Sequence, residues 1–467
     1  MCYQTFYSEE EEPSLLTGQE DCLVMNILVP LIASESNPVP VIVYIHSGAF
    51  SGGSANMGRL HYVAKRDVIV ISFNYRVGAL GFACLRTEEI PGNAGLKDQL
   101  AALKWINKNI KKFGGDPNRV TLAGFSVGAA MAEILALSKQ TDGLINKLIL
   151  ESGTALAPIA IATDPINTAK NIAESLGFKN KGKIQELNEF YINAPIKDLV
   201  IKSINFFLTN STFGFAPCIE STVMNPQPLL TESPVDILKK NEFKKIPILT
   251  GFSDMEGLSR VNKFQEWVEI MNVNFEKFLP ADLVFDNDSD REKAVRKIKY
   301  YYFKDQEVTQ NSKQEYVNYF SDVMFKYPIT RSAKFYAKSK APVYFYEFSY
   351  VGELNAKHYF MGIIKGASHR DQTAYIWDFF DFTNALSDMD TRDRMTYMWT
   401  DFATFGDPTA FESSILKVKW IKYTDEDENY MSIGNELEMK KNPMADNYKL
   451  WSDIYDKYYW NPTSTKA

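Results

Sequence analysis

The sequence predicts an α/β fold in which a mostly parallel central sheet carries helices on both faces. Three observations support this class: short runs rich in β-branched residues recur along the chain, most of their positions are apolar, and helical patterns separate them. Strands that are apolar on both faces belong inside a sheet that is covered on both sides. Alternating strands and helices then imply parallel βαβ units with right-handed crossovers.

Six runs predict the strands of this sheet. In chain order they are PVIVYIH at Pro40–His46, DVIVISFNY at Asp67–Tyr75, NRVTLAGFS at Asn118–Ser126, LINKLILESG at Leu144–Gly153, KKIPILTGF at Lys244–Phe252 and APVYFYEF at Ala341–Phe348. Their length and apolar character are typical of buried strands.

Helical patterns lie between these runs. Residues Gly95–Lys112 place apolar side chains at helical spacing and end before two glycines, and a small-residue, helix-prone stretch begins at Ser126. The polar segment Asp282–Tyr319 is helix-like, which indicates an insertion over the sheet. Because no repeat or linker interrupts the pattern, we expect residues 1–467 to form a single domain.

Composition excludes several classes of function. The chain has 467 residues, 45% of them hydrophobic, so a disordered protein is excluded. The net charge of -7, with no basic run, argues against nucleic acid as a partner. We expect no membrane span, because no apolar stretch reaches about eighteen residues. No segment with the basic and apolar parts of a signal peptide is visible at the start of the chain.

The stretch GFSVGAA at residues 124–130 carries the first candidate for chemistry. A serine between two glycines, placed where a strand ends and a helix begins, indicates a nucleophile on a tight turn. The helix start directs N–H groups at developing negative charge. The alternative is that Ser126 only caps the helix.

A glycine-rich turn, HSGAFSGGS, follows the strand predicted at Pro40–His46. Such a turn can supply backbone donors for an oxyanion, and the candidates are the amides of Gly48 and Ala49 together with that of Val127. An ordinary glycine-rich turn is the alternative.

Scarcity of histidine limits the choice of a general base. Of the 4 histidines, two follow Ser126, as the chain order serine, acid, histidine requires. His369 lies in the small-residue loop GASHRDQ, which suits an exposed imidazole, whereas His358 lies among bulky aromatics and is interpreted as structural. The loop FSDMEG offers Asp254 and Glu256 as the acid, and the residues alone leave both open.

Several motifs together resemble the type-B carboxylesterase and cholinesterase family of α/β-hydrolases, in particular its insect-type esterases. The motifs are EDCLVMNILVP at Glu20–Pro30, NYRVGALGF at Asn74–Phe82, GNAGLKDQLAALKWINKNIKKFGGDP at Gly92–Pro117, GFSVGAA, LILESG, DMEG, GASHRDQ and FATFGDP at Phe402–Pro408. The resemblance covers essentially the whole chain. It implies an α/β-hydrolase fold, truncated at the N-terminus relative to the family because only a short segment precedes EDCL.

The resemblance also implies roles for individual residues. It matches Ser126 to the nucleophile and His369 to the base, and it matches Glu256, rather than Asp254, to the acid. The family's oxyanion donors correspond to the backbone amides of Gly48, Ala49 and Val127. The family forms a disulfide where this chain has Cys2 and Cys22, whereas Cys84 and Cys218 match no family disulfide and are expected to be buried thiols.

The site departs from the family pattern at four positions. The usual GESAGA becomes GFSVGA, so that Phe125 replaces a glutamate and Val127 replaces an alanine. The usual HGGGF becomes HSGAF, with Ser47 and Ala49 in place of glycines. Loss of the glutamate should weaken stabilisation of the imidazolium. A positive φ at Ala49 would be strained.

The resemblance implies a serine carboxylic-ester hydrolase that forms an acyl-enzyme on a small apolar ester, without a metal or other cofactor. The alternatives are a catalytically impaired binding or adhesion protein and a ligand-sequestering protein that deacylates slowly. Secretion is expected by resemblance, with Asn210 and Asn287 as candidate glycosylation sites in NST and NDS. Neither a particular ester nor an oligomeric state follows from the sequence.

Overall fold

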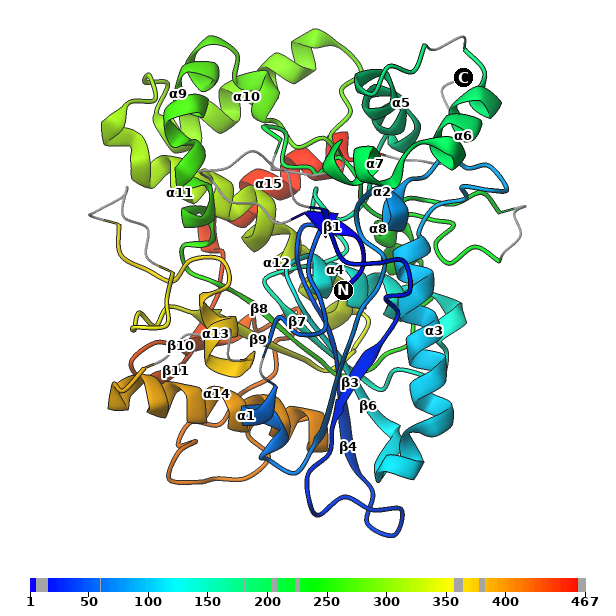
Figure 1. Cartoon of the computed structure of the whole chain (residues 1–467). Helices are drawn as coiled ribbons and strands as arrows, with labels where there is room; N and C mark the ends of the chain where they lie inside the picture. The colour runs from blue at the N-terminus through cyan, green and yellow to red at the C-terminus, as the bar shows by residue number, and fades with distance from the viewer. Residues whose placement is uncertain are drawn as a thin grey trace.

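The computed structural model in Figure 1 describes residues 1–5, 16–58, 60–179, 182–202, 208–222, 227–356, 364–377 and 383–460. Within these residues the central sheet has nine strands in the order β11-β10-β9-β8-β7-β6-β4-β5-β3. The strands are β3 (Met25–Leu28), β4 (Val39–Ile45), β5 (Ile69–Phe73), β6 (Gly115–Phe125), β7 (Lys147–Glu151), β8 (Ile248–Ser253), β9 (Val343–Phe348), β10 (Asn429–Ile433) and β11 (Leu437–Lys441). A separate small sheet pairs β1 (Gln4–Thr5) with β2 (Leu16–Thr17).

The helices alternate with these strands along most of the chain. They are α1 (His61–Ala64), α2 (Gly78–Phe82), α3 (Ala94–Asn109), α4 (Val127–Leu137), α5 (Pro165–Ser175), α6 (Ile184–Asn193), α7 (Ile196–Lys202), α8 (Pro234–Lys240), α9 (Phe264–Val273), α10 (Asp288–Phe303), α11 (Lys313–Ser321), α12 (Tyr327–Lys338), α13 (Asp371–Trp377), α14 (Leu386–Phe405) and α15 (Ala445–Tyr458). Within the described ranges, none of them is both long enough and apolar enough to cross a bilayer.

The predicted α/β class is confirmed. Each of the six apolar runs forms a strand, β4 to β9, and neighbours among these six pair in parallel. The sequence did not predict the two antiparallel edges, where β3 pairs with β5 and β11 pairs with β10. Neither edge strand is fully buried: β3 is half-buried along its length and β11 is half-buried or exposed at every position. They therefore lack the continuous burial that gives the interior strands their apolar runs.

Helices cover both faces of the sheet, as Figure 1 shows for α3 on one side and α14 on the other. Along β4, Val41 and Val43 belong to a core that includes the apolar residues of α3 and α4. Ile42 and Tyr44, which point the opposite way, belong to a second core built with α13 and α14. Both faces of the strand are therefore buried, which is why its sequence is almost uniformly apolar.

The segment Asp282–Tyr319 is helical as expected, because it contains α10 and most of α11. α11 continues through the π-helical turn η6 (Asp322–Lys326) into α12, which packs against β8 and β9. This continuity joins the segment to the helices that cover the sheet. π-helical turns occur often at functional sites, and this one positions Phe325.

The structure contains two disulfides. Cys2 is bonded to Cys22, with a sequence separation of 20. The expectation that Cys84 and Cys218 are buried thiols is wrong, because they form a second disulfide across a separation of 134 residues. Gly92 makes room for this bond, since a Cβ at Gly92 would lie 2.4 Å from the sulfur of Cys218. The partners are remote in sequence, so only the tertiary fold brings them together.

The longer disulfide loop predicts a larger contribution to stability. Replacing Cys84 and Cys218 with serine should lower the free energy of unfolding by about 2–4 kcal/mol, because the unfolded chain regains the entropy of a long loop. The matched control replaces Cys2 and Cys22, which close a much shorter loop, and its loss should be smaller by about 1–2 kcal/mol. Urea unfolding of both variants measures the difference. Equal losses, or a larger loss in the control, would contradict the prediction.

Candidate active site

The loop between β6 and α4 holds Ser126 in a strained conformation. Its φ is 55° and its ψ is -123°, a backbone conformation that residues other than glycine seldom adopt. Backbone strain of this kind is concentrated at functional sites. Glycine is required on both sides: a Cβ at Gly124 would lie 2.4 Å from the backbone of Gly128, and a Cβ at Gly128 would lie 2.4 Å from the carbonyl of Ile45. The Ser126 side chain makes no capping bond to α4, so the helix-cap alternative does not describe it.

The structure brings Ser126, His369 and Glu256 together from three distant parts of the chain. His369 Nε2 lies 2.9 Å from Ser126 Oγ, and His369 Nδ1 lies 2.6 Å from Glu256 Oε2. The Glu256 side chain is fully buried, whereas 13% of the His369 side chain is exposed. His358, the other histidine that follows Ser126, lies outside the described residues. The three side chains therefore form one hydrogen-bonded chain, an arrangement that can activate a hydroxyl.

The Glu256 carboxylate is surrounded by donors at the end of β8. Its Oε1 accepts a hydrogen bond of 2.5 Å from the Ser152 hydroxyl and one of 2.8 Å from the backbone N–H of Ser253. With His369 on its other oxygen, both carboxylate oxygens are hydrogen-bonded. These bonds fix the orientation of the carboxylate toward the imidazole.

Asp254, the alternative acid, has a different position. Its Oδ1 accepts the backbone N–H of Ala367 at 2.7 Å, so it anchors the loop that carries His369. On the other side of that loop, the carboxylate of Asp371 accepts the backbone N–H of Ser368 at 2.6 Å. Burial raises the pKa of both aspartates to about 6. The anchoring role of these two carboxylates was not predicted, although Asp371 follows the histidine closely in GASHRDQ.

Two aromatic rings contact the His369 imidazole. The ring centroids of Phe125 and Phe325 lie 4.6 and 4.3 Å from that of His369. Phe125 therefore occupies the position beside the base where the family pattern has a carboxylate. Phe325 was not predicted to lie at the site, because η6 is distant from Ser126 and His369 in the chain and carries no motif.

The turn after β4 lies beside the start of α4, since an added Cβ at Gly128 would approach the His46 carbonyl as well as that of Ile45. Gly48 has a φ of 125° and Ala49 a φ of 52°, so the positive φ considered for Ala49 is present. A Cβ at Gly48 would lie 2.1 Å from the carbonyl oxygen of Gly52. Val127 is the first residue of α4, and the first N–H groups of a helix have no acceptor within it.

A second buried carboxylate, Glu151, lies directly behind the serine. Its backbone oxygen accepts the N–H of Ser126 at 2.8 Å, and its side-chain Oε1 accepts the indole N–H groups of Trp377 and Trp399 at 2.9 Å each. Glu151 thus joins the end of β7 to α13 and α14. Burial raises the pKa of its carboxyl to about 7. The sequence around Glu151 did not predict this contact, because the two tryptophans are far away in the chain.

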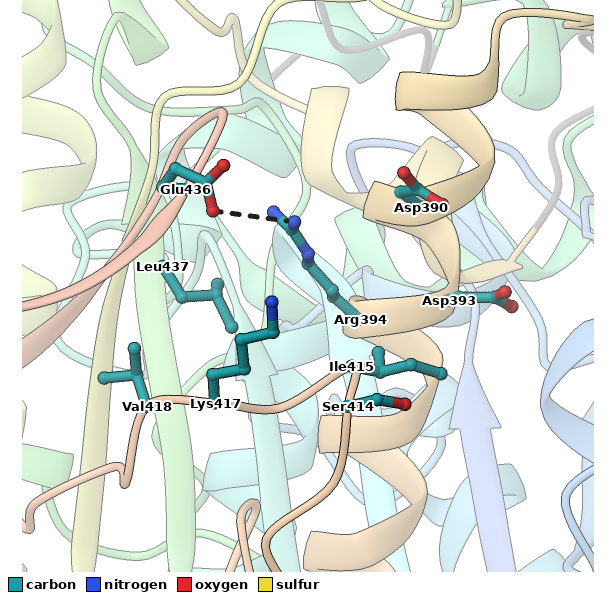
Figure 2. Close-up of a pocket in the computed structure, with 9 residues that line it drawn as sticks. All are labelled: Asp390, Asp393, Arg394, Ser414, Ile415, Lys417, Val418, Glu436 and Leu437. Atoms are coloured by element: carbon teal, nitrogen blue, oxygen red, sulfur yellow. Dashed lines mark ion pairs between the residues drawn. The ribbon is translucent and has the colours of Figure 1, made fainter.

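A separate cavity of about 340 Å³ lies between α14, β11 and the segment around residues 414–418. Figure 2 shows Arg394 and Lys417 at this cavity, with Glu436 3.6 Å from the Arg394 guanidinium. Its lining mixes both signs of charge. None of Ser126, Glu256 and His369 lines it, so it is distinct from the candidate active site.

The two candidate glycosylation sites differ in exposure. Asn287 is exposed and caps α10, with its Oδ1 accepting the N–H of Asp290 at 2.9 Å. Asn210 is partly buried, and its Oδ1 accepts the Thr212 hydroxyl at 3.1 Å. Glycosylation at both asparagines stays a prediction.

Comparison with known proteins places the chain among esterases. Residues 1–451 match the sequence profile of the Carboxylesterase family. Esterase FE4 of Myzus persicae is 33% identical over 86% of this chain and 73% of its own length. Neuroligin-3 of Mus musculus is 27% identical over 96% of this chain and 59% of its own length. The crystal structure of juvenile hormone esterase from Manduca sexta, with OTFP covalently attached, has a TM-score of 0.82 and 29% identity, covering 94% of this chain and 84% of that one.

Because the carboxyl of Glu151 is buried, the difference in stability between the wild type and the variant Glu151→Gln should depend on pH. An acid whose pKa is raised on folding, here from an ordinary 4.5 to about 7, loses folded-state stability as pH rises through that range. The variant Glu151→Gln stays neutral and keeps an acceptor for both indoles. Between pH 5 and pH 8, the free energy of unfolding of the wild type should therefore fall by about 2–3 kcal/mol relative to the variant. Urea unfolding at both pH values measures this difference, and a difference that does not change with pH would contradict the prediction.

Proposed function

The chain belongs to the carboxylesterase family and is a carboxylic ester hydrolase with an α/β-hydrolase fold, and we propose that it acts through an acyl-enzyme on Ser126. The observation that carries the proposal is the hydrogen-bonded chain from Ser126 through His369 to Glu256. A hydroxyl is a weak nucleophile, and an adjacent base oriented by a buried acid activates it.

In the acylation step, His369 Nε2 takes the proton of Ser126 as its Oγ attacks the ester carbonyl. Glu256 holds the Nδ1–H of the imidazole and stabilises the imidazolium that forms. The carbon–oxygen bond of the ester then breaks, and His369 returns the proton to the departing alcohol. In the second step, a water molecule attacks the acyl group by the same route and restores Ser126.

The negative oxygen formed in each step needs preorganised donors. We assign them to the backbone N–H groups of Gly48, Ala49 and Val127, because the turn after β4 and the start of α4 lie side by side. Ala49 adopts a positive φ at this turn. The cost of that conformation is acceptable at a site where a fixed amide direction stabilises the transition state.

The substrate we propose is a small apolar carboxylic ester. Phe125 and Phe325 pack against the imidazole, and Val127 follows the nucleophile, so these three side chains add apolar surface around the reacting groups. The two disulfides fit an extracellular location, and we propose secretion. The covalently attached OTFP of the juvenile hormone esterase from Manduca sexta is compatible with covalent chemistry in this fold.

The alternative is a binding protein that hydrolyses esters slowly or not at all. The similarity to neuroligin-3 is the observation that favours this alternative. Val127 adds a β-branched side chain beside the nucleophile, and Ala49 adds one methyl group at the oxyanion turn. Against this alternative, the three side chains of the proposed triad lie within hydrogen-bonding distance of one another.

Substitution of the nucleophile tests the proposal. The variant Ser126→Ala should lose at least about 10⁴-fold in kcat/KM for a short-chain aryl ester, and it should not react with a fluorophosphonate probe. The control Ser175→Ala, an exposed serine at the end of α5, should match the wild type in both assays. Labelling with a single burst and no turnover would favour the ligand-sequestering alternative. A folded wild type that is neither labelled nor active would refute the proposal.

The oxyanion assignment predicts that two adjacent positions respond differently to small changes. Gly48→Ala places a methyl group against the Gly52 carbonyl and in a conformation that disfavours side chains, so it should displace the turn and lower kcat by about 10²–10³-fold. Ala49→Gly relaxes the turn and should keep kcat within about threefold of the wild type. Steady-state kinetics at matched folded fractions, checked by circular dichroism, measure both effects. Full activity in Gly48→Ala would contradict the assignment.

A further inference from the structure

We propose that the end of the molecule opposite the candidate active site binds an anionic lipid surface. Two segments meet at this end: residues 29–38, which join β3 to β4, and the last turns of α3 with the short helix η1 (Ile110–Phe113) that follows it. Figure 1 shows both segments at the lower edge of the view. Strand β6 begins at this end with Gly115, and Ser126 follows its opposite end.

Large apolar side chains are exposed on both segments. Leu31 is fully exposed, at 105%, and the neighbouring Ile32 is 49% exposed. Trp105 and Phe113 are 41% and 40% exposed, and their ring centroids lie 6.2 Å apart. A fully exposed leucine adds nothing to the core of its own chain, so the free energy of burying it is available to a partner. We call these four residues the apolar tip.

The two segments of the apolar tip are in contact with each other. An added Cβ at Gly114 would lie 2.5 Å from the backbone nitrogen of Ser34, and the Gly114 carbonyl accepts the N–H of Val39 at 2.9 Å. Gly114 follows Phe113 directly, and Ser34 lies two residues after Ile32. The exposed side chains of the loop and of the helix end therefore belong to one surface.

Lysines accompany the apolar tip on the helix side. They recur at i, i+4, i+7 and i+8, a spacing that keeps side chains on one face of a helix, and all are exposed: Lys104, Lys108, Lys111 and Lys112. Among the residues that the structure describes, none of these lysines takes part in an ion pair. The acidic residues of segments 29–38 and 104–119 are Glu35 and Asp116, and Asp116 pairs with Arg119 at 2.8 Å. This end is therefore positively charged, although the net charge of the chain is -7.

The combination of these side chains selects a lipid surface over other partners. Lysines are attracted to anionic headgroups, while tryptophan and aliphatic side chains enter the boundary between headgroups and acyl chains. A polyanion such as a sulfated polysaccharide would contact the lysines and leave Leu31 and Ile32 in water. An apolar partner would bury the apolar tip and gain nothing from the charge. An anionic lipid surface uses both.

The position of this surface leaves the candidate active site accessible. Strand β6 has 11 residues, so its two ends are separated by roughly 30 Å at the usual rise of a strand. A chain docked through the apolar tip therefore presents Ser126 on the side away from the membrane. Membrane binding and the hydrolysis of a soluble ester are consequently independent properties, and each is tested without the other.

Sedimentation with unilamellar vesicles tests the proposal. The wild type should bind vesicles of phosphatidylcholine with about 30% phosphatidylserine at least about tenfold more tightly than vesicles of phosphatidylcholine alone. Binding to the anionic vesicles should weaken as salt is raised, because salt screens the lysines. Equal binding to the two kinds of vesicle, or no binding to either, would overturn the proposal.

Two variants separate the apolar contribution from the charge. Replacing Leu31 and Ile32 with serine should weaken binding to anionic vesicles by about tenfold or more, because these side chains no longer enter the lipid. Replacing the four lysines with glutamine should weaken it by about 100-fold or more. All these positions are exposed, so both variants should keep the kcat of the wild type for a soluble aryl ester. Unchanged vesicle binding in either variant would contradict the proposal.

The chain offers a matched control for the loss of charge. Residues 239–245 also contain four exposed lysines, Lys239, Lys240, Lys244 and Lys245, in a segment without an exposed large apolar side chain. Replacing these four with glutamine changes the net charge equally and should alter vesicle binding by less than about threefold, because no apolar tip holds them at the membrane. A loss as large as that of the first set would show a general effect of net charge and would overturn the assignment.

A second measurement distinguishes lipid from another polyanion. Phosphatidylcholine with brominated acyl chains, included in the anionic vesicles, should quench part of the tryptophan fluorescence of the bound wild type and less of that of Trp105→Phe, because Trp105 lies in the apolar tip. Equal quenching in the two proteins would contradict insertion of the tip. Heparin binding that survives the loss of Leu31 and Ile32, without vesicle binding, would assign the lysines to a sulfated polysaccharide and overturn the lipid proposal.

Discussion

The close approach of β4, β6, β7 and α4 around Ser126 is the constraint on which the rest of the site depends. The parallel register places the end of β6 between β4 and β7, and the chain must then reverse into a helix within one residue. This reversal is possible only because Gly124, Gly128 and Gly153 carry no side chain: an added Cβ at Gly153 would lie 2.0 Å from the Ser126 carbonyl oxygen. The hydrogen bond from Ser126 N–H to the Glu151 carbonyl fixes the turn. The same geometry presents the hydroxyl to His369 at the start of α4, where the first N–H groups have no acceptor within the helix.

Buried polar groups maintain this arrangement at a cost in stability. Glu151 joins the strand behind the serine to α13 and α14, while Asp254 and Asp371 anchor the loop that carries His369. Burial raises the pKa of each of these carboxyls, so their ionised forms reduce stability near neutral pH. Functional sites commonly reduce the stability of the folded state in this way. The two buried apolar cores on the faces of the sheet offset that loss.

The parts of the structure that the sequence predicted are those with local signals. Strands buried on both faces appear as apolar runs, and the glycines around the serine mark a turn that only glycine permits. The parts it could not predict depend on tertiary position. Local residues left the choice between Asp254 and Glu256 open, and the family resemblance favoured Glu256. The hydrogen bond of Asp254 to the loop backbone was not predicted, whereas Glu256 contacts the imidazole. Phe325, in the π-helical turn η6, contacts His369 although the two are distant in the chain. The disulfide of Cys84 and Cys218 likewise joins segments that are adjacent only after folding.

The most direct test of the account is to trap the covalent intermediate and locate it. Rapid acid quenching of the enzyme during hydrolysis of an aryl ester, followed by peptide mass spectrometry, reports which residue carries the acyl group. The account predicts the mass increase of one acyl group on Ser126, within the peptide that joins β6 to α4. An acyl group on any other residue, or ester turnover with no acylated peptide at any quench time, would contradict it.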